Sequence, residues 1–122
     1  MIIGYMTKRK DPMVSVVVRG PSGTMEVQAI VDTGFTEYLT LPPAVVESLG
    51  LPIIDNISVI LADGSSVACN VHDARIKWDG DWIGINVQPA ETTPLIGLGL
   101  LDGYEVRIEV APDGAVEISS LT

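Results

Sequence analysis

The sequence predicts an all-β fold, a barrel or sandwich of short strands accompanied by a short helix. Three observations support this prediction. Apolar and polar residues alternate along many short segments, and Asp-Gly turn signals recur between those segments. Only one segment carries clear start and stop signals for a helix. Short strands at such spacing are typical of barrels and sandwiches, and 122 residues are expected to form one domain, residues 1–122.

The first half of the chain predicts a hairpin, a short strand and a helix. Met13–Arg19 is rich in β-branched residues, and Thr24–Val31 alternates along its length, so the two should pair around the turn residues that separate them. Glu37–Leu41 predicts a short strand. Pro42–Gly50 predicts the helix, because proline fits a first turn and glycine fits a left-handed cap.

Three more hairpins are predicted in the second half. Their strands are Ile57–Leu61 with Val67–Val71, Ala74–Trp78 with Trp82–Val87, and Tyr104–Val110 with Ala115–Ser119. Trp78 and Trp82, on either side of the Asp79–Asp81 turn, are expected to form a cross-strand pair.

The composition excludes several classes of protein. With 47% apolar residues the chain can bury a core, so it is not disordered. No apolar run reaches the ~18 residues that a membrane helix needs, and the first residues do not resemble a signal peptide. A net charge of −9 argues against a nucleic-acid partner. We therefore expect a cytoplasmic protein that binds neither nucleic acid nor membrane.

Single cysteine and histidine residues limit the possible chemistry further. Cys69 alone cannot form an intrachain disulfide, and His72 alone leaves no cluster for a structural zinc site, so no metal is expected. Three residues apart on a strand, the two side chains should point to opposite faces, which is poor geometry for a nucleophile and its base. We expect instead a buried thiol and a surface imidazole.

The strongest candidate for chemistry is Asp32-Thr33-Gly34, which follows the apolar pair Ile30-Val31. The pattern places a carboxylate where a strand enters a tight turn, and Gly34 lets the backbone turn sharply and approach a ligand. Many Asp-Thr-Gly tripeptides are plain turns, so the tripeptide alone is also compatible with an unrelated β domain.

A second motif, Pro94–Leu101, follows about sixty residues downstream and places Gly97 after Leu95 and Ile96. In this order and spacing the chain resembles the retropepsin-like aspartic proteases, most closely their bacterial and archaeal stand-alone members. The resemblance covers roughly Val14 to Ile118. It implies a closed β-barrel in which an apolar-apolar-Gly strand supports the active-site turn, followed by a second short helix at Leu98–Asp102.

The resemblance also assigns roles to individual residues. Asp32 would be the catalytic aspartate, Thr33 would bond to its symmetry mate, and Gly34 would offer its carbonyl to substrate. Phe35 stands where the family usually has alanine, serine or threonine, which would either narrow the first substrate pocket or shift the turn. The remaining assignments are Ile96 and Gly97 as support for the turn, and a flap hairpin at about residues 59–70 with Ala62, Asp63, Gly64 and Ser65 at its tip.

The proposed chemistry requires two copies of the chain. Peptide hydrolysis without metal or covalent nucleophile uses two carboxylates that share one proton. The sequence has a single Asp-Thr-Gly, so the second aspartate should be Asp32 of another copy. We therefore expect a homodimeric aspartic endopeptidase that cleaves extended polypeptides and needs no cofactor. The alternative is a non-catalytic dimeric peptide-binding or regulatory module of the same fold.

In the family, terminal strands interleave between subunits. The resemblance makes Ala115–Leu121 the candidate for this role here, together with Met1–Tyr5. We expect the edge of Ala115–Leu121 to be unpaired in a single chain. Thr36 and Leu98 stand where the retroviral members have an ion pair at the dimer contact, and this chain lacks that pair.

Overall fold

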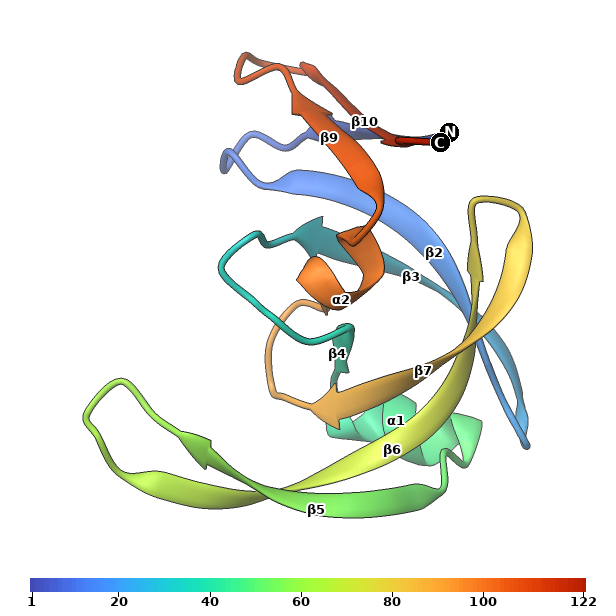
Figure 1. The fold of residues 1–122 in the computed structure, drawn as a ribbon, viewed down its shortest axis with the longest axis vertical. Coiled ribbons are helices and arrows are strands. Elements are labelled where there is room, and N and C mark those ends of the chain that lie inside the picture. The colour runs from blue at the N-terminus through green and yellow to red at the C-terminus, as the bar shows by residue number, and fades with distance from the viewer.

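A closed barrel of six strands lies at the centre of the computed structural model, which describes residues 1–122 (Figure 1). The order of strands around the barrel is β6 (Ser66–Trp78), β7 (Asp81–Pro89), β4 (Leu39–Leu41), β8 (Leu95–Ile96), β3 (Gly23–Val31) and β2 (Pro12–Gly20). The barrel closes where β2 pairs with β6, with Val18 opposite Ile76. The closed β-barrel implied by the sequence is therefore confirmed.

Four strands extend the sheet beyond the barrel. On one side β5 (Ile53–Ile60) pairs only with β6. On the other side β1 (Ile2–Met6), β10 (Ala115–Ser120) and β9 (Tyr104–Ile108) follow β2 in that order. The strands β5 and β9 are therefore the two edges of the ten-stranded sheet.

Two short helices complete the fold. Helix α1 (Pro43–Leu49) ends at Gly50, whose φ of 65° is the left-handed cap that the sequence predicts. Helix α2 (Leu98–Leu101) lies where the resemblance places a second helix, and it buries Leu100 and Leu101. Neither helix has the length and apolar composition needed to cross a membrane.

The alternation in the first hairpin orients its side chains as predicted. Val27, Ala29 and Val31 of β3 are buried, and so are the facing residues of β2, Val14, Val16 and Val18. They belong to a hydrophobic cluster of 22 buried residues that also includes residues of β1, β10 and both helices. This burial supplies most of the favourable free energy of such a fold.

The prediction of two separate strands at Val67–Val71 and Ala74–Trp78 is wrong, because β6 is one continuous strand. Val71 and His72 are both buried, so the buried face changes there and the period of two is interrupted. The surface placement of His72 is also wrong, since its Nδ1 donates a 2.8 Å hydrogen bond to the Leu51 carbonyl. Cys69 is partly exposed rather than buried.

The expected pair of Trp78 and Trp82 does not form. Asp79 and Gly80 both have positive φ, 49° and 89°, as in a two-residue hairpin turn. This turn sets Trp78 opposite Asp81, so the two tryptophans are out of register. Trp78 is buried, whereas Trp82 stacks under the guanidinium of Arg19 at 3.9 Å.

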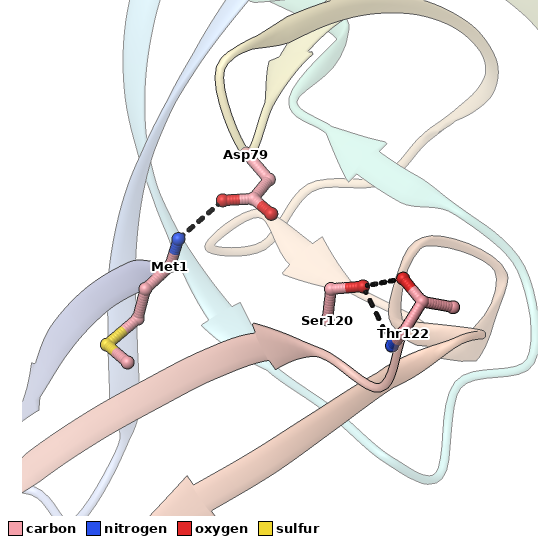
Figure 2. A network of polar contacts seen from close by, with 4 residues as sticks. All are labelled: Met1, Asp79, Ser120 and Thr122. Carbon is pink, nitrogen blue, oxygen red and sulfur yellow. Dashed lines mark hydrogen bonds and ion pairs between the residues drawn. The ribbon is translucent and has the colours of Figure 1, made fainter.

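The two chain ends lie side by side because β1 and β10 are antiparallel neighbours (Figure 1). Figure 2 shows the amino group of Met1 bound to Asp79 at 2.6 Å, and Ser120 bonded to Thr122. Strand β10 pairs with β1 on one side and with β9 on the other. The expectation of an unpaired edge at Ala115–Leu121 is therefore wrong; the free edge on this side of the sheet is β9.

Candidate active site

Asp32 lies directly after β3, in a turn held by its own hydrogen bonds. The N–H of Gly34 donates to Oδ1 of Asp32 at 2.9 Å, and the N–H of Phe35 donates to the Asp32 carbonyl at 3.2 Å. A Cβ at position 34 would lie 3.2 Å from Oδ1, a tight contact that would press on the carboxylate. The carboxylate is therefore fixed by the backbone that follows it.

Strand β8 holds both ends of the segment that contains this turn. It pairs in parallel with β3, with Val31 opposite Ile96, and antiparallel with β4, with Leu39 opposite Ile96. The N–H of Asp32 donates to the Ile96 carbonyl at 2.9 Å. Ile96 thus lies between the strand before the turn and the strand after it.

Three consecutive N–H groups after β8 bind the loop that joins Asp32 to β4. Gly97 donates to Tyr38 at 3.0 Å, Leu98 to Phe35 at 2.7 Å and Gly99 to Glu37 at 3.0 Å, each to a backbone carbonyl. Position 97 must be glycine in this arrangement, because a Cβ there would overlap the Glu37 carbonyl oxygen and lie 2.6 Å from the Phe35 ring. At Gly97 the backbone that follows β8 thus packs closely against the backbone of the loop between Asp32 and β4.

Solvent reaches the turn from one side. Asp32 and Phe35 are half-buried, while Thr33 and Gly34 are exposed. Four surface pockets of the single chain are lined by other residues, and Asp32 borders none of them. No group of three or more His, Cys, Asp or Glu side chains comes together in a way that could hold a metal ion. The turn is therefore open to solvent mainly at Thr33 and Gly34.

The predicted flap residues form the turn of the β5–β6 hairpin, which projects from the barrel in Figure 1. The turn closes through a 2.7 Å hydrogen bond from Leu61 N–H to the Ser65 carbonyl, and Gly64 has a φ of 85°. Oδ1 of Asp63 accepts bonds from the hydroxyl and the N–H of Ser65, which lower the pKa of Asp63 below its usual 3.8. Ala62 and its neighbours in the turn are exposed.

Two supporting residues were not predicted from the sequence. The buried hydroxyl of Thr40 accepts a 2.9 Å hydrogen bond from Leu95 N–H and so joins β4 to β8. Gly99 also packs against the loop, where a Cβ would lie 3.0 Å from the Glu37 carbonyl oxygen. The spacing of Gly97 and Gly99 was the available signal for the second of these, since two such glycines indicate that a backbone approaches closely.

Comparison with known proteins gives the fold a name. No protein-family model and no curated protein matches the sequence. Among solved structures, the chain is similar to a retropepsin-like aspartic protease from Rickettsia conorii, with a TM-score of 0.62, 15% identity, and coverage of 99% of this chain and 91% of that one. It is also similar to EIAV protease solved with the inhibitor HBY-793, with a TM-score of 0.54, 20% identity, and coverage of 77% and 88%.

The first of these likenesses extends over nearly the full length of both chains, and the six-stranded barrel and two short helices agree with it. The resemblance drawn from Asp32-Thr33-Gly34 and Leu95-Ile96-Gly97 is thus confirmed at the level of the fold. This chain has the retropepsin-like aspartic protease fold.

Proposed function

We propose that this protein is an aspartic endopeptidase that acts as a homodimer on extended polypeptides. The observation that carries the proposal is the placement of Asp32. Its carboxylate follows a barrel strand in a tightly bonded turn, within a fold whose similar solved structures are named as proteases. Because a single cysteine cannot form an intrachain disulfide, we assign the enzyme to the cytoplasm, where disulfides are rare.

The need for two chains follows from the positions of the four aspartates that directly precede a glycine. Asp63 lies in the β5–β6 turn and Asp79 in the β6–β7 turn, while Asp102 follows α2 and Asp113 lies in the β9–β10 connection. Of these four, only Asp79 follows a barrel strand, and it lies in a two-residue hairpin turn in which its Oδ1 binds the amino group of Met1. None of the four therefore lies in a turn like that of Asp32. A second carboxylate placed in the same way therefore has to come from Asp32 of a partner, on a twofold axis.

The chemistry assigned to the pair is a direct attack by water. One carboxylate accepts a proton from the water as its oxygen bonds to the peptide carbonyl carbon, and the other gives its proton to the carbonyl oxygen. The tetrahedral intermediate then collapses. Its C–N bond breaks, a proton moves to the leaving nitrogen, and a carboxylic acid and an amine are released.

The residues beside Asp32 have supporting roles in this proposal. The bond from Gly34 N–H to Oδ1 fixes the carboxylate before substrate arrives, so little reorganisation is needed at the reaction. The exposed Thr33 hydroxyl is assigned to a bond with its symmetry mate, and the Gly34 carbonyl to the substrate backbone. Half-buried Phe35 narrows the first substrate pocket.

The β5–β6 hairpin is assigned to cover the substrate. It carries exposed apolar side chains close to its turn: Ile60 is 78% exposed, Val67 46% and Leu61 43%. Such side chains lose contact with water when a peptide is enclosed beneath them, which favours binding. An extended peptide bound as an added strand makes backbone hydrogen bonds of the same kind as those of the sheet.

The test is cleavage of a diverse peptide library by wild type and by Asp32→Asn at pH 3–7. The substitution keeps the shape of the side chain and removes the carboxylate, so cleavage should fall by roughly 10²–10⁴-fold. Asp113→Asn is the matched control, since asparagine tolerates the positive φ of 56° there. Equal activity of wild type and Asp32→Asn would remove Asp32 from the mechanism. Tight peptide binding without turnover by wild type would favour a non-catalytic binding module.

A further inference from the structure

The outer surface of β2, β6 and β7 carries a cationic face, and we propose that this face binds an acidic, extended segment of a polypeptide. The cationic face consists of Arg19, Arg75 and Lys77, all of which are exposed. In the enzyme it recruits substrates that carry such a segment outside the part that is cleaved. This recruitment rests on the proposed function, whereas the binding of an acidic segment does not.

The register of the strands places the three cations side by side. Arg19 lies directly opposite Arg75 where β2 pairs with β6, and directly opposite residues share one face of a sheet. Lys77 lies two residues beyond Arg75 on β6, so it points to the same face. Ile76, between them, is fully buried on the other face.

All three cations are positioned around Trp82 of β7. The Arg19 guanidinium lies over the indole ring, 3.9 Å from its centre. Arg75 donates a 3.2 Å hydrogen bond to the Trp82 carbonyl. Lys77 lies directly opposite Trp82 in the ladder of β6 and β7. These contacts hold both guanidiniums before a ligand arrives, which reduces the entropy lost on binding.

No carboxylate of the chain neutralises the cationic face. The ion pairs of the structure are made by the amino group of Met1 and by Arg107, so none involves the three cations. Two guanidiniums at directly opposite positions repel each other. An anion that binds both offsets this repulsion, and guanidinium groups match the geometry of carboxylates. The arrangement therefore favours a bound anion.

Little of the remaining surface is suited to an acidic ligand. The chain has seven basic residues against sixteen acidic ones. Three of the basic residues, Lys8, Arg9 and Lys10, follow β1, and Arg107 is paired with glutamates. The other three form the cationic face. The run at residues 8–10 is thus the natural control for an attraction that depends on charge alone.

The spacing of the cations selects an extended segment. Arg75 and Lys77 are two residues apart on a strand, a separation of roughly 6.6 Å. Alternate residues of an extended peptide have this same spacing and lie on one side of it. Glutamates at positions i and i+2 can therefore contact both cations at once, with Arg19 beside them. Asp73, two residues before Arg75 on the same exposed face, limits the site at that end.

The cationic face is separate from the turn at Asp32. Ile30, two residues before Asp32, lies opposite Met13 of β2. Arg19 lies six residues further along β2, a distance of roughly 20 Å at about 3.3 Å per residue. In Figure 1 the β6–β7 turn and the loop that follows β3 lie on opposite sides of the barrel. One polypeptide can occupy both places only if a linker joins its two segments.

The binding test uses Asp32→Asn, so that the probe is not cleaved. The probe is a fluorescein-labelled peptide of alternating glutamate and serine, and its binding is followed by fluorescence anisotropy at low salt. Adding Arg75→Gln/Lys77→Gln should raise the dissociation constant about fivefold or more. Lys8→Gln/Arg9→Gln removes two charges at another exposed place and should leave the constant unchanged. Equal weakening by the two pairs of changes, or no binding at all, would overturn the site.

A second peptide tests the spacing without any change to the cationic face, so this comparison does not depend on how the variants fold. It has the same composition, but its glutamates come in adjacent pairs separated by two serines. No two of them are then two residues apart, so the peptide should bind at least about threefold more weakly. Equal affinity of the two peptides would overturn the binding of an extended segment. Displacement of the alternating peptide by an equal concentration of inorganic phosphate would also overturn it and indicate a site for a single oxyanion.

Cleavage by the protein with Asp32 intact tests the recruitment. A peptide that the enzyme cleaves is joined to the alternating segment by a Gly-Ser linker of about 16 residues, whose mean span is roughly 20–24 Å. A linker of about two residues, which reaches less than ~8 Å, is the comparison. The long linker should lower KM about fivefold with kcat unchanged. This advantage should disappear in Arg75→Gln/Lys77→Gln and persist in Lys8→Gln/Arg9→Gln.

The outcomes separate the binding site from the proposed function. Specific binding of the alternating peptide without cleavage of any peptide would support the cationic face and remove the protease activity. Cleavage without specific binding would overturn the cationic face and leave the protease activity intact. Specific binding with the same KM for both linkers would overturn the recruitment of substrates.

Discussion

The N–H of Leu98 donates a 2.7 Å hydrogen bond to the carbonyl of Phe35, three residues after the candidate catalytic aspartate. This bond joins the start of α2 to the loop that shapes the site. The bonds from Gly97 and Gly99 to the same loop lie on either side of it. The position of Asp32 therefore depends on a segment more than sixty residues away in sequence.

Gly97→Ala should displace this loop. The new Cβ would overlap the Glu37 carbonyl oxygen, which belongs to the backbone and cannot move aside cheaply. Overpacking of this kind typically costs about 1–3 kcal/mol, so we expect a lower free energy of unfolding and loss of peptide cleavage. Urea unfolding and peptide cleavage measure the two effects. Gly84→Ala, on β7 with open space around it, is the matched control and should preserve both.

Thr40→Val should destabilise the protein by about 1–3 kcal/mol, because it leaves the partly buried Leu95 N–H without its acceptor. Valine has nearly the same shape, so the change mainly removes the hydroxyl. Thr24→Val at an exposed position of β3 is the control. An equal response of the two variants to urea would show that the hydroxyl of Thr40 does not hold β4 to β8.

Acid should weaken the turn of the β5–β6 hairpin only at a pH below the usual pKa of an aspartate. The hydroxyl of Ser65 makes the larger contribution and its N–H the smaller one in lowering the pKa of Asp63 below 3.8. The ionised side chain therefore stabilises the turn fully above about pH 3.8. That stabilisation is lost as the pH falls through the lowered pKa. An NMR titration should give a midpoint for Asp63 below 3.8, and Ser65→Ala should raise it. A midpoint unchanged by Ser65→Ala would contradict this hydrogen-bond account.

Cleavage should follow a bell-shaped pH profile with its optimum on the acidic side of neutrality. Two facing carboxylates act with one proton between them, so activity falls when both are protonated and when both are ionised. The two apparent pKa values that set the limbs of this profile are properties of the pair of carboxylates and not of either residue alone. At each pH the rate should be measured at a protein concentration well above the dimer dissociation constant. A rate that rises steadily to pH 9 would argue against a shared proton.

Local chemistry made much of the fold predictable. The β2–β3 hairpin follows from its alternation, and α1 follows from Pro42, Pro43 and Gly50. The long strand β6 was split in the prediction because Val71 and His72 are both buried, and a strand that changes its buried face looks like two strands. Strand β1 pairs with residues more than a hundred positions away, which no local pattern reveals.

The site was predictable only in part. The turn at Asp32 and the close backbone packing at Gly97 belong to short motifs, so the sequence pointed to both segments. Thr40 accepts a hydrogen bond from Leu95, which lies 55 residues away in the sequence. No local pattern around a single threonine in a strand predicts such a bond. The pairing of β10 within its own chain likewise depends on the fold, and it moves the free edge to β9.

The most direct test of the shared site is subunit mixing. Wild type is exchanged with a ninefold excess of Asp32→Asn, with exchange followed by native mass spectrometry, and cleavage is measured per wild-type chain. Each mixed dimer holds one asparagine in its pair, so random exchange should reduce this activity to about one tenth. A ninefold excess of Asp113→Asn should cause no such loss. Full activity per wild-type chain in the presence of exchanged Asp32→Asn would contradict a site built from two copies of Asp32.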